Sequence, residues 1–286
     1  MNHRILILGS SEEFTELVKL ARSRGIFTIV CDGNPDGTAK KEADLACHTD
    51  VRSIDRIAAL CRKERVDGIL TAFSDLLLEC MVKIAAKAEL PCYLLPKQLS
   101  FYRDKSVMKK MFAALGIPTS RYAETDAACS PDAFAGLRFP VVTKPLDRYG
   151  SRGVLVLDSP EEIRSRFHEI CAGSGTEKIL VEEYNTGFEF NLMAWVSSGQ
   201  VYILGIADRE KSPGEPHSIP ICSRNVYPSC LMKHVYPEAK RILEKVIGYT
   251  GQTEGELSRQ FFWHPDRGSE VCEIAARFLG YEHELI

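Results

Sequence analysis

The stretch that decides the fold is FPVVTKPLDRYGSRGV, residues 139–154. Its first half is an apolar run of strand length that ends near Lys144. A turn with Ser151 between Gly150 and Gly153 leads into a second apolar run. Glycine lets backbone amides approach an anion closely, and a lysine neutralises the anion's charge. The pattern is therefore typical of a polyphosphate site, although a plain β-hairpin with a solvated lysine would look the same.

Acidic residues follow another apolar run in EKILVEEYNTGFEFNL, residues 177–192. Glu182, Glu183 and Tyr184 stand at the end of this predicted strand, and Glu189 comes after a turn. Carboxylates in such a place can accept hydrogen bonds from the amino group of adenine and from ribose hydroxyls. A solvated strand end is the alternative interpretation.

A third segment, LSRQFFWHPDRGSEVCEIAAR, spans residues 257–277 and predicts a hairpin that turns at HPDRG. Glu273, Ala275 and Arg277 alternate and so share one face of their strand. A symmetrical turn would place Gln260 opposite Glu273. A carboxylate and a guanidinium on one face suit magnesium and phosphate held side by side, whereas a plain salt bridge is the alternative.

The first hundred residues show a different pattern. Apolar runs of strand length at 4–8, 26–31 and 66–72 alternate with amphipathic helical patterns at 11–24 and 53–65. Strands that alternate with helices predict a parallel, doubly wound domain.

The loop after the first of these strands argues against dinucleotide binding. It reads GSSEEF from Gly9 and lacks the further glycines that let a backbone approach a pyrophosphate. Glu12 and Glu13 would also repel an anion at the helix start. We therefore expect a structural or substrate-lining role for this loop and for Asp32, which ends the second strand.

Beyond a boundary near Pro96 the pattern changes to α+β, beginning with a helix over 100–115. The predicted hairpins pair 139–145 with 153–157, 188–196 with 200–207, and 258–263 with 270–277, and helices are expected at 160–171 and 237–248. The stretch 209–227 is the longest predicted loop, and its Arg209 and His217 are candidates for contacting the substrate.

Composition narrows the class of protein. With 45% hydrophobic and 26% charged residues, the 286-residue chain predicts an ordinary globular protein of about two domains. A net charge of -3 without a basic stripe argues against duplex nucleic acid. No apolar run approaches the roughly 20 residues of a membrane helix, so we expect a cytoplasmic protein. The ten dispersed cysteines predict reduced, mostly buried thiols.

Taken in order, these segments resemble the ATP-grasp superfamily, in the branch shared by carboxylate-amine ligases and by biotin-carboxylase and carbamoyl-phosphate-synthetase-like enzymes. DKSVMKKMFAALGIPTS, residues 104–120, is similar to the first helix of that domain, and the three segments above are similar to its phosphate strand, adenine hinge and magnesium strand. The resemblance implies an α/β Rossmann-like N-terminal domain, residues 1–97, followed by an α+β ATP-grasp domain, residues 98–286. The latter is expected to be incomplete at its C-terminus, because GYEHELI stands where family members usually continue.

The resemblance also implies roles for individual residues. Arg277 and Lys144 would be the catalytic residues, with Arg277 facing the acyl phosphate. The residues implied to bind ATP are Lys105, Lys144, Ser151, Glu182, Glu183, Tyr184 and Glu189. Magnesium would be held by Glu273 and Gln260.

The magnesium strand departs from the family pattern. That strand usually reads E-x-N-x-R and faces another acid, whereas Ala275 and Gln260 stand in those places here. A glutamine oxygen can ligate magnesium, but alanine cannot. One charged ligand therefore remains, unless Glu256 contributes from nearby, and the second metal position is in doubt.

The implied activity is that of an ATP-dependent, ADP-forming ligase, which converts a carboxylate to an acyl phosphate and couples it to an amine or similar nucleophile. Positioned cations would supply most of the catalysis. A bicarbonate-using carboxylase or carbamoyl-phosphate-type enzyme and a catalytically weak ATP-binding module are the alternatives. The implied cofactors are ATP and Mg²⁺, and the expected partners are small-molecule carboxylate and amine substrates. Neither nucleic acid nor a membrane is expected, and a homodimer is compatible with the resemblance.

Overall fold

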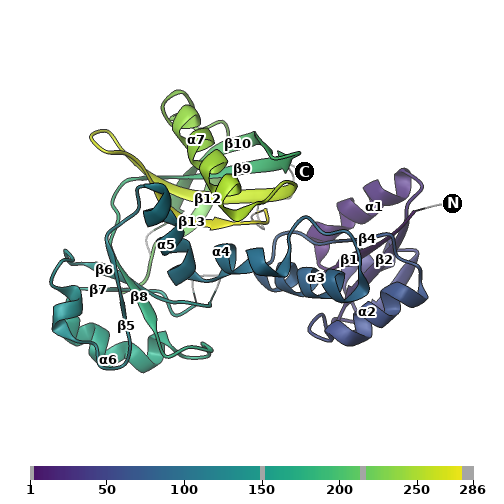
Figure 1. Cartoon of the computed structure of the whole chain (residues 1–286), viewed down its shortest axis with the longest axis horizontal. Helices are drawn as coiled ribbons and strands as arrows, with labels where there is room; N and C mark the ends of the chain where they lie inside the picture. Colours follow the sequence, from purple (N-terminus) through teal and green to yellow (C-terminus); the bar gives the residue numbers. More distant parts are fainter. Residues whose placement is uncertain (1–2, 149–151, 213–216, 279–286) are drawn as a thin grey trace. The chain divides into compact units, whose positions relative to one another are not determined.

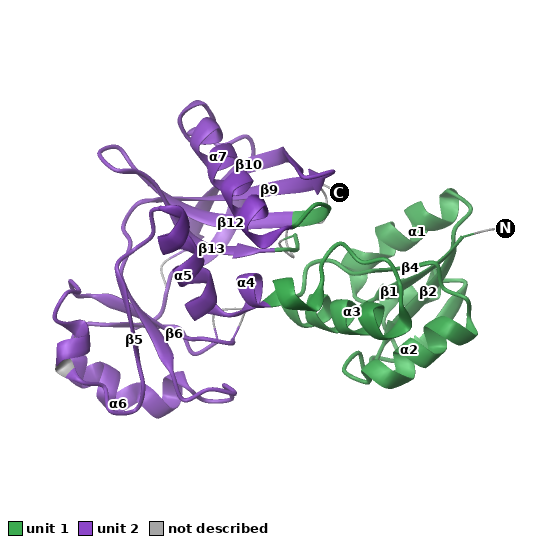
Figure 2. Cartoon of the chain, viewed as in Figure 1, with its two compact units in different colours: residues 1–99, 252–256, 276–286 green, residues 100–251, 257–275 purple. Residues whose placement is uncertain are grey.

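The structure, a computed structural model, describes residues 3–148, 152–212 and 217–278. Contacts divide the chain into two compact units, which are coloured separately in Figure 2. The first unit comprises residues 1–99, 252–256 and the chain from 276 onward, and the second comprises residues 100–251 and 257–275.

The first unit is built on a four-stranded parallel sheet with the strand order β3-β2-β1-β4. Figure 1 labels β1, β2 and β4 of this sheet. The strands are β1 (Arg4–Leu8), β2 (Phe27–Asp32), β3 (Leu45–His48) and β4 (Gly68–Leu70). The parallel pairing expected for the three predicted strands is confirmed. The short edge strand β3 was not predicted, because it alternates in burial and has no continuous apolar run.

Three helices accompany this sheet: α1 (Thr15–Ser23), α2 (Ile54–Lys63) and α3 (Asp75–Ala88). The first two lie within the helical patterns predicted from the sequence. Phe14 and Val18 pack with Ile7 and Val30 of the sheet in one buried cluster. The amphipathic pattern of α1 therefore forms because its apolar stripe covers the sheet.

The second unit contains an antiparallel sheet of order β5-β8-β6-β7. Its strands are β5 (Tyr122–Thr125), β6 (Val141–Pro145), β7 (Leu155–Leu157) and β8 (Ile179–Glu183). Helix α6 (Pro160–Ile170) packs Ile163 and Phe167 against Val141 and Val181. The predicted hairpin around Lys144 and the helix that follows it are confirmed.

The second sheet of this unit has the order β11-β10-β9-β12-β13. Its strands are β9 (Phe188–Ser197), β10 (Gln200–Ser212), β11 (Ile221–Val226), β12 (Gly255–His264) and β13 (Gly268–Ala275). The two predicted hairpins, β9 with β10 and β12 with β13, are confirmed. The loop predicted over 209–227 is wrong for most of its described part, because β10 continues to Ser212 and β11 pairs with it. That ladder satisfies backbone groups that a loop would leave to water.

The remaining helices differ from the sequence prediction at their ends. The predicted helix 100–115 is two helices, α4 (Leu99–Arg103) and α5 (Lys105–Leu115), because the carboxylate of Asp104 accepts hydrogen bonds from the amides of Ser106 and Val107 and so begins a new helix. Helix α7 (Met232–Thr250) begins before the predicted start and contains Pro237 inside it. No helix within the described ranges is long and apolar enough to cross a lipid bilayer.

Candidate nucleotide and phosphate site

Lys144 and Glu182 form the centre of the candidate site. Lys144 lies near the end of β6 and Glu182 lies in the neighbouring strand β8, which runs antiparallel to it. The Nζ atom of Lys144 is 2.5 Å from Oε2 of Glu182, and their side chains are only 15% and 5% exposed. The solvated lysine of the simpler interpretation is therefore wrong, because this lysine is largely removed from water.

A second lysine, Lys109 of α5, contacts the other carboxylate oxygen of Glu182 and donates to Oγ1 of Thr119. Its side chain is 2% exposed. Burial alone would raise the pKa of Glu182, but the charges of Lys109 and Lys144 lower it to about 2. Sequence reasoning missed Lys109, although its position four residues after Lys105 places both on one face of the helix.

Cys272 and Glu273 of β13 bring the candidate magnesium strand to Lys144. Lys144 donates to Sγ of Cys272 at 3.6 Å. Burial alone would lower the pKa of Lys144, but Cys272, Glu182 and Glu273 raise it above its ordinary value. This lysine therefore stays charged at neutral pH.

The predicted pairing of Gln260 with Glu273 is confirmed. It results from a shift in the strand register and not from a symmetrical turn. From the pair of His264 with Gly268 onward, the register continues regularly and then shifts between Phe261 and Gln260. Cys272 is the extra residue of this irregularity, as in a β-bulge. Without the shift, Cys272 would stand opposite Gln260.

Glu189, at the start of β9, lies between cations. Arg209 Nη1 and Lys211 Nζ each approach one of its carboxylate oxygens at 2.8 Å, and the amide nitrogen of Gln260 donates to it as well. The predicted ribose carboxylate is thus 7% exposed and already paired. The sequence did not indicate Lys211 as a site residue, and it indicated Arg209 only as a substrate contact. Both residues reach Glu189 because β10 pairs with β9.

The other residues predicted to bind ATP are distributed around this centre. Lys105 begins α5 and donates to the carbonyl of Arg148 at 2.6 Å, just before the predicted phosphate loop. Ser151, predicted to cover the phosphates, lies outside the described residues. Glu183 is bound through its carboxylate to the guanidinium of Arg138 at 2.8 Å. Because successive residues of a strand face opposite ways, Glu183 points away from the side of Glu182.

Tyr184, the last residue of the predicted hinge, donates its backbone amide to the carbonyl of Pro140 at 3.0 Å. This bond continues the pairing between the β8 and β6 segments beyond the end of the strand. The hinge therefore continues the hydrogen-bond ladder of β8. The side chain of Tyr184 is half-buried.

Two predicted residues are placed in the first unit. Arg277 forms an ion pair with Asp75, with 2.8 Å between Nη2 and Oδ2. Glu256 accepts a hydrogen bond from the amide of Phe278, and burial raises its pKa to about 8. A protonated carboxyl group is a poorer ligand for magnesium than a carboxylate, and a contribution of Glu256 to the metal stays a prediction.

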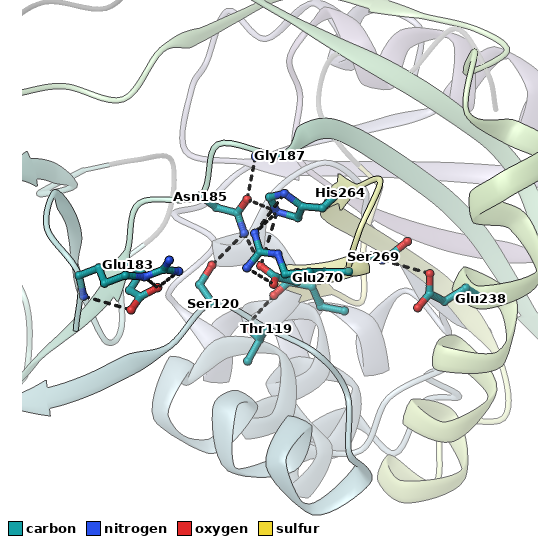
Figure 3. Close-up of polar contacts among 12 residues, drawn as sticks. Thr119, Ser120, Glu183, Asn185, Gly187, Glu238, His264, Ser269 and Glu270 are labelled. Carbon is teal, nitrogen blue, oxygen red and sulfur yellow. Dashed lines mark hydrogen bonds and ion pairs between the residues drawn. The ribbon is translucent and has the colours of Figure 1, made fainter. Parts of the chain in front are cut away.

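The side chain of Asn185, directly after the hinge, is held by a polar network that the sequence did not reveal (Figure 3). Its amide nitrogen donates to Oγ of Ser120 at 3.1 Å and to Glu270 at 2.5 Å. Its oxygen lies 2.9 Å from Nε2 of His264 and accepts from the amide of Gly187 at 2.9 Å. The network connects the hinge to the tip of the β12–β13 hairpin and so fixes where the hinge leaves β8.

The arrangement suits a polyphosphate better than it suits a metal ion. The cations Lys144, Arg209 and Lys211 are balanced by buried carboxylates, and an anionic ligand can take over such partners. On the metal side Glu273 is exposed, whereas the amide nitrogen of Gln260 points to Glu189. Among the described residues, the group of three acidic or histidine ligands that could hold a cation lies elsewhere and comprises Asp158, Glu162 and His217.

The fold and this site define an ATP-grasp protein. The family model of the phosphoribosylglycinamide synthetase ATP-grasp (A) domain matches residues 103–282, and the chain belongs to that family. The match includes all three segments that carry the resemblance in the sequence. It begins at the end of α4, close to where the second unit starts.

Known proteins agree with this assignment. The chain is 25% identical to phosphoribosylamine-glycine ligase of Lactococcus lactis over 99% of its length and 71% of that protein. It is 26% identical to formate-dependent phosphoribosylglycinamide formyltransferase of Methylococcus capsulatus, covering 70% of the chain and 52% of the relative. The biotin carboxylase domain of Hydrogenobacter thermophilus 2-oxoglutarate carboxylase, solved with MgADP and bicarbonate, matches with a TM-score of 0.84 at 17% identity, covering 100% of this chain and 67% of that one. The chain thus spans between half and three quarters of these proteins.

Proposed function

We propose that this chain carries the nucleotide-binding part of an ATP-dependent, ADP-forming ligase that joins a carboxylate to an amine through an acyl phosphate. The observation that carries the proposal is the buried group of Lys144, Glu182 and Lys109, with Cys272 and Glu273 of the candidate magnesium strand beside it. Two charged lysines in a low-dielectric site are suited to stabilise a transferred phosphoryl group. The carboxylate-amine ligases of this family give the reaction class.

For the nucleotide, we propose that Lys144 and Lys105 hold the phosphates together with the loop through Ser151. Glu182, the backbone of Glu183 and Tyr184, and Glu189 would receive adenine and ribose. The side chain of Glu183 is left out, because it points to the other side of β8 from Glu182. Arg209 and Lys211 are released when Glu189 turns to a ribose hydroxyl, and they then face the phosphates.

For the metal, we propose one magnesium position at Glu273, with Gln260 as a neutral ligand after its amide turns. Bound magnesium would neutralise phosphate charge. The metal position has fewer ligands than the family pattern for two reasons. Gln260 is engaged with Glu189, and residue 275 is an alanine. A second magnesium ion is therefore not part of the proposal.

For the first unit, we propose a Rossmann-like domain that contributes to substrate binding without a dinucleotide. Its parallel sheet would offer the carboxyl ends of its strands, where ligands bind in such folds. We assign Arg277 to substrate binding. For this role its guanidinium would have to leave the ion pair with Asp75. The cytoplasmic location and the homodimer stay predictions.

A catalytically weak ATP-binding module is the second candidate. The observation that favours it is the hydrogen bond that already engages Gln260 with Glu189, next to an alanine at 275 that offers no ligand. Such a protein would bind ATP through the lysines and release little ADP. The bicarbonate-using alternative predicts instead that bicarbonate alone stimulates ADP release.

The test compares nucleotide binding in Lys144→Ala with a matched variant, Lys178→Ala, which removes an exposed lysine just before β8. Calorimetry should show ATP affinity lost in the first variant and unchanged in the second. Equal affinity in both variants would refute the site. ADP release is then measured with pooled amino acids and carboxylic acids, with and without bicarbonate, to separate the ligase from the two alternatives.

A further inference from the structure

Two cysteines of the first unit stand side by side in its parallel sheet, and neither belongs to the residues proposed for the nucleotide site. Cys31 of β2 and Cys47 of β3 are direct partners in the register of the two strands. Directly paired residues of neighbouring strands point to the same face of a sheet, and the strands lie about 4.8 Å apart. This spacing falls within the Cα separation of disulfides, roughly 4.4 to 6.8 Å.

The local contacts hold the two sulfur atoms together. Both thiols contact Thr49. The Sγ atom of Cys47 lies 3.3 Å from Oγ1 of Thr49, and Cys31 donates to the carbonyl of the same residue at 3.7 Å. One threonine therefore orients both sulfurs at the end of the strand pair.

We propose that Cys31 and Cys47 are an oxidation site, which a peroxide converts to a disulfide across β2 and β3. The two thiols differ in the way that a nucleophile and a resolving thiol must differ. Cys31 is fully buried, whereas Cys47, on the edge strand, is half-buried and open to a small oxidant. Peroxide therefore reaches Cys47 first.

The charge around the pair agrees with these roles. The neighbouring thiol of Cys31 lowers the pKa of Cys47 below its ordinary value against the effect of burial, and Thr49, Arg56 and Lys40 lower it further. The neighbouring thiol of Cys47 and burial raise the pKa of Cys31, to which Asp32 also contributes. These directions agree with the exposure of the two residues and favour Cys47 as the attacking thiol.

The chemistry balances with hydrogen peroxide as the oxidant. The thiolate of Cys47 attacks one peroxide oxygen, the O–O bond breaks, and with one proton the products are a sulfenic acid and water. The sulfur of Cys31 then attacks that of Cys47, so that the S–S bond forms and the S–OH bond breaks. The hydroxide leaves with the thiol proton as a second water, and a thiol reductant reverses the reaction.

The disulfide would act on the edge of the sheet where substrates bind in such folds. Asp32 and His48 directly follow the two cysteines, and Lys40 connects them by binding the carbonyl of Asp32 at 2.8 Å and Nδ1 of His48 at 3.1 Å. A covalent bond between the strands therefore fixes both loops at the carboxyl end of the sheet.

The experiment treats the whole chain with hydrogen peroxide, unfolds it in urea so that buried thiols are accessible, blocks the remaining thiols with N-ethylmaleimide and maps the peptides by mass spectrometry without reduction. We expect the peptide pair containing Cys31 and Cys47 to be cross-linked about tenfold more than any other pair, because only Cys47 combines thiolate character with an adjacent thiol. A reductant should restore labelling of both residues. Labelling of both after peroxide, or a bond from Cys47 to Cys61, would overturn the proposal.

Variants assign the two roles. Cys31→Ser should leave a sulfenic acid on Cys47 that dimedone traps, whereas Cys47→Ser should leave Cys31 unmodified. Cys61→Ser is the matched control, because Cys61 is another buried thiol of the same unit, and this variant should form the disulfide as the native chain does. Loss of the disulfide in that control, or a trapped sulfenic acid on Cys31, would show that the assignment is wrong.

Discussion

Replacing Lys109 with methionine should destabilise the second unit strongly, because Glu182 would lose one of its two buried cations. Methionine has a similar length but no charge, so the packing around α5 changes little while the ion pair is removed. Breaking a buried pair by removing one partner costs about 3–5 kcal/mol. Lys144 remains 2.5 Å from Glu182 and compensates in part, so we expect a loss near the lower limit, about 3 kcal/mol.

The assay is urea unfolding followed by tryptophan fluorescence. Both tryptophans of the chain, Trp195 and Trp263, belong to the second unit and so report on its unfolding alone. With a slope of about 2 kcal/mol per molar urea, the midpoint should fall by about 1.5 M. The matched control is Lys110→Met, which removes the neighbouring exposed lysine and should change the stability by less than about 0.5 kcal/mol.

The reasoning also predicts non-additivity. Combining Lys109→Met with Glu182→Gln removes both charges of the pair, so the double variant should be more stable than the sum of the two single changes by at least about 1 kcal/mol. Simple additivity, or a Lys109→Met midpoint equal to that of Lys110→Met, would refute the claim that this buried ion pair is formed in the native protein.

Three further outcomes follow from the same site. The folded pKa of Glu182 is about 2, below its unfolded value near 4.5. Its contribution of about 3 kcal/mol to stability is therefore present above pH 4.5 and is lost as the pH falls toward 2. In acid unfolding followed by fluorescence, the native chain should lose more stability than Glu182→Gln over this pH range. Glu273→Gln should keep ATP affinity but lose the magnesium dependence of that affinity, and an unaltered magnesium titration would contradict its metal role. Asn185→Ala should weaken ATP binding about tenfold, because it releases the hinge. Thr186→Ala, a change at the exposed next residue, should leave the affinity unchanged. If calorimetry gives the same affinity for both variants, Asn185 does not position the hinge.

The parts of the fold that the sequence predicted are those set by local patterns. The hairpin around Lys144 is signalled by an apolar run, a glycine turn and a second apolar run, all within one short segment. The same holds for the β12–β13 hairpin, where HPDRG gives the turn. The candidate site was predictable to the extent that it lies on these hairpins, as Lys144 and Glu273 do.

The parts that the sequence did not predict depend on contacts between distant segments. Lys109 looks like a surface lysine of an amphipathic helix until α5 is placed against Glu182 of β8. Asn185 gains much of its role from Glu270 and His264, which lie near the turn of another hairpin. The strand β11 was hidden because its sequence, ICSRNV, has neither an apolar run nor a regular alternation and stands between two prolines. Its backbone finds its partner in the edge of β10.

The register shift at Cys272 decides which side chain of β13 stands opposite Gln260. The extra residue places Glu273, and not Cys272, opposite Gln260, so a carboxylate stands where the metal is proposed. The same carboxylate helps to raise the pKa of Lys144. Ala275 shares that face and offers no ligand, so Glu273 is the charged ligand on which the proposed metal position depends, whereas the phosphates can draw on several cations. Loss of the carboxylate should therefore abolish ADP release while ATP is still bound. A Glu273→Gln variant that releases ADP at the native rate would show that the magnesium is held elsewhere.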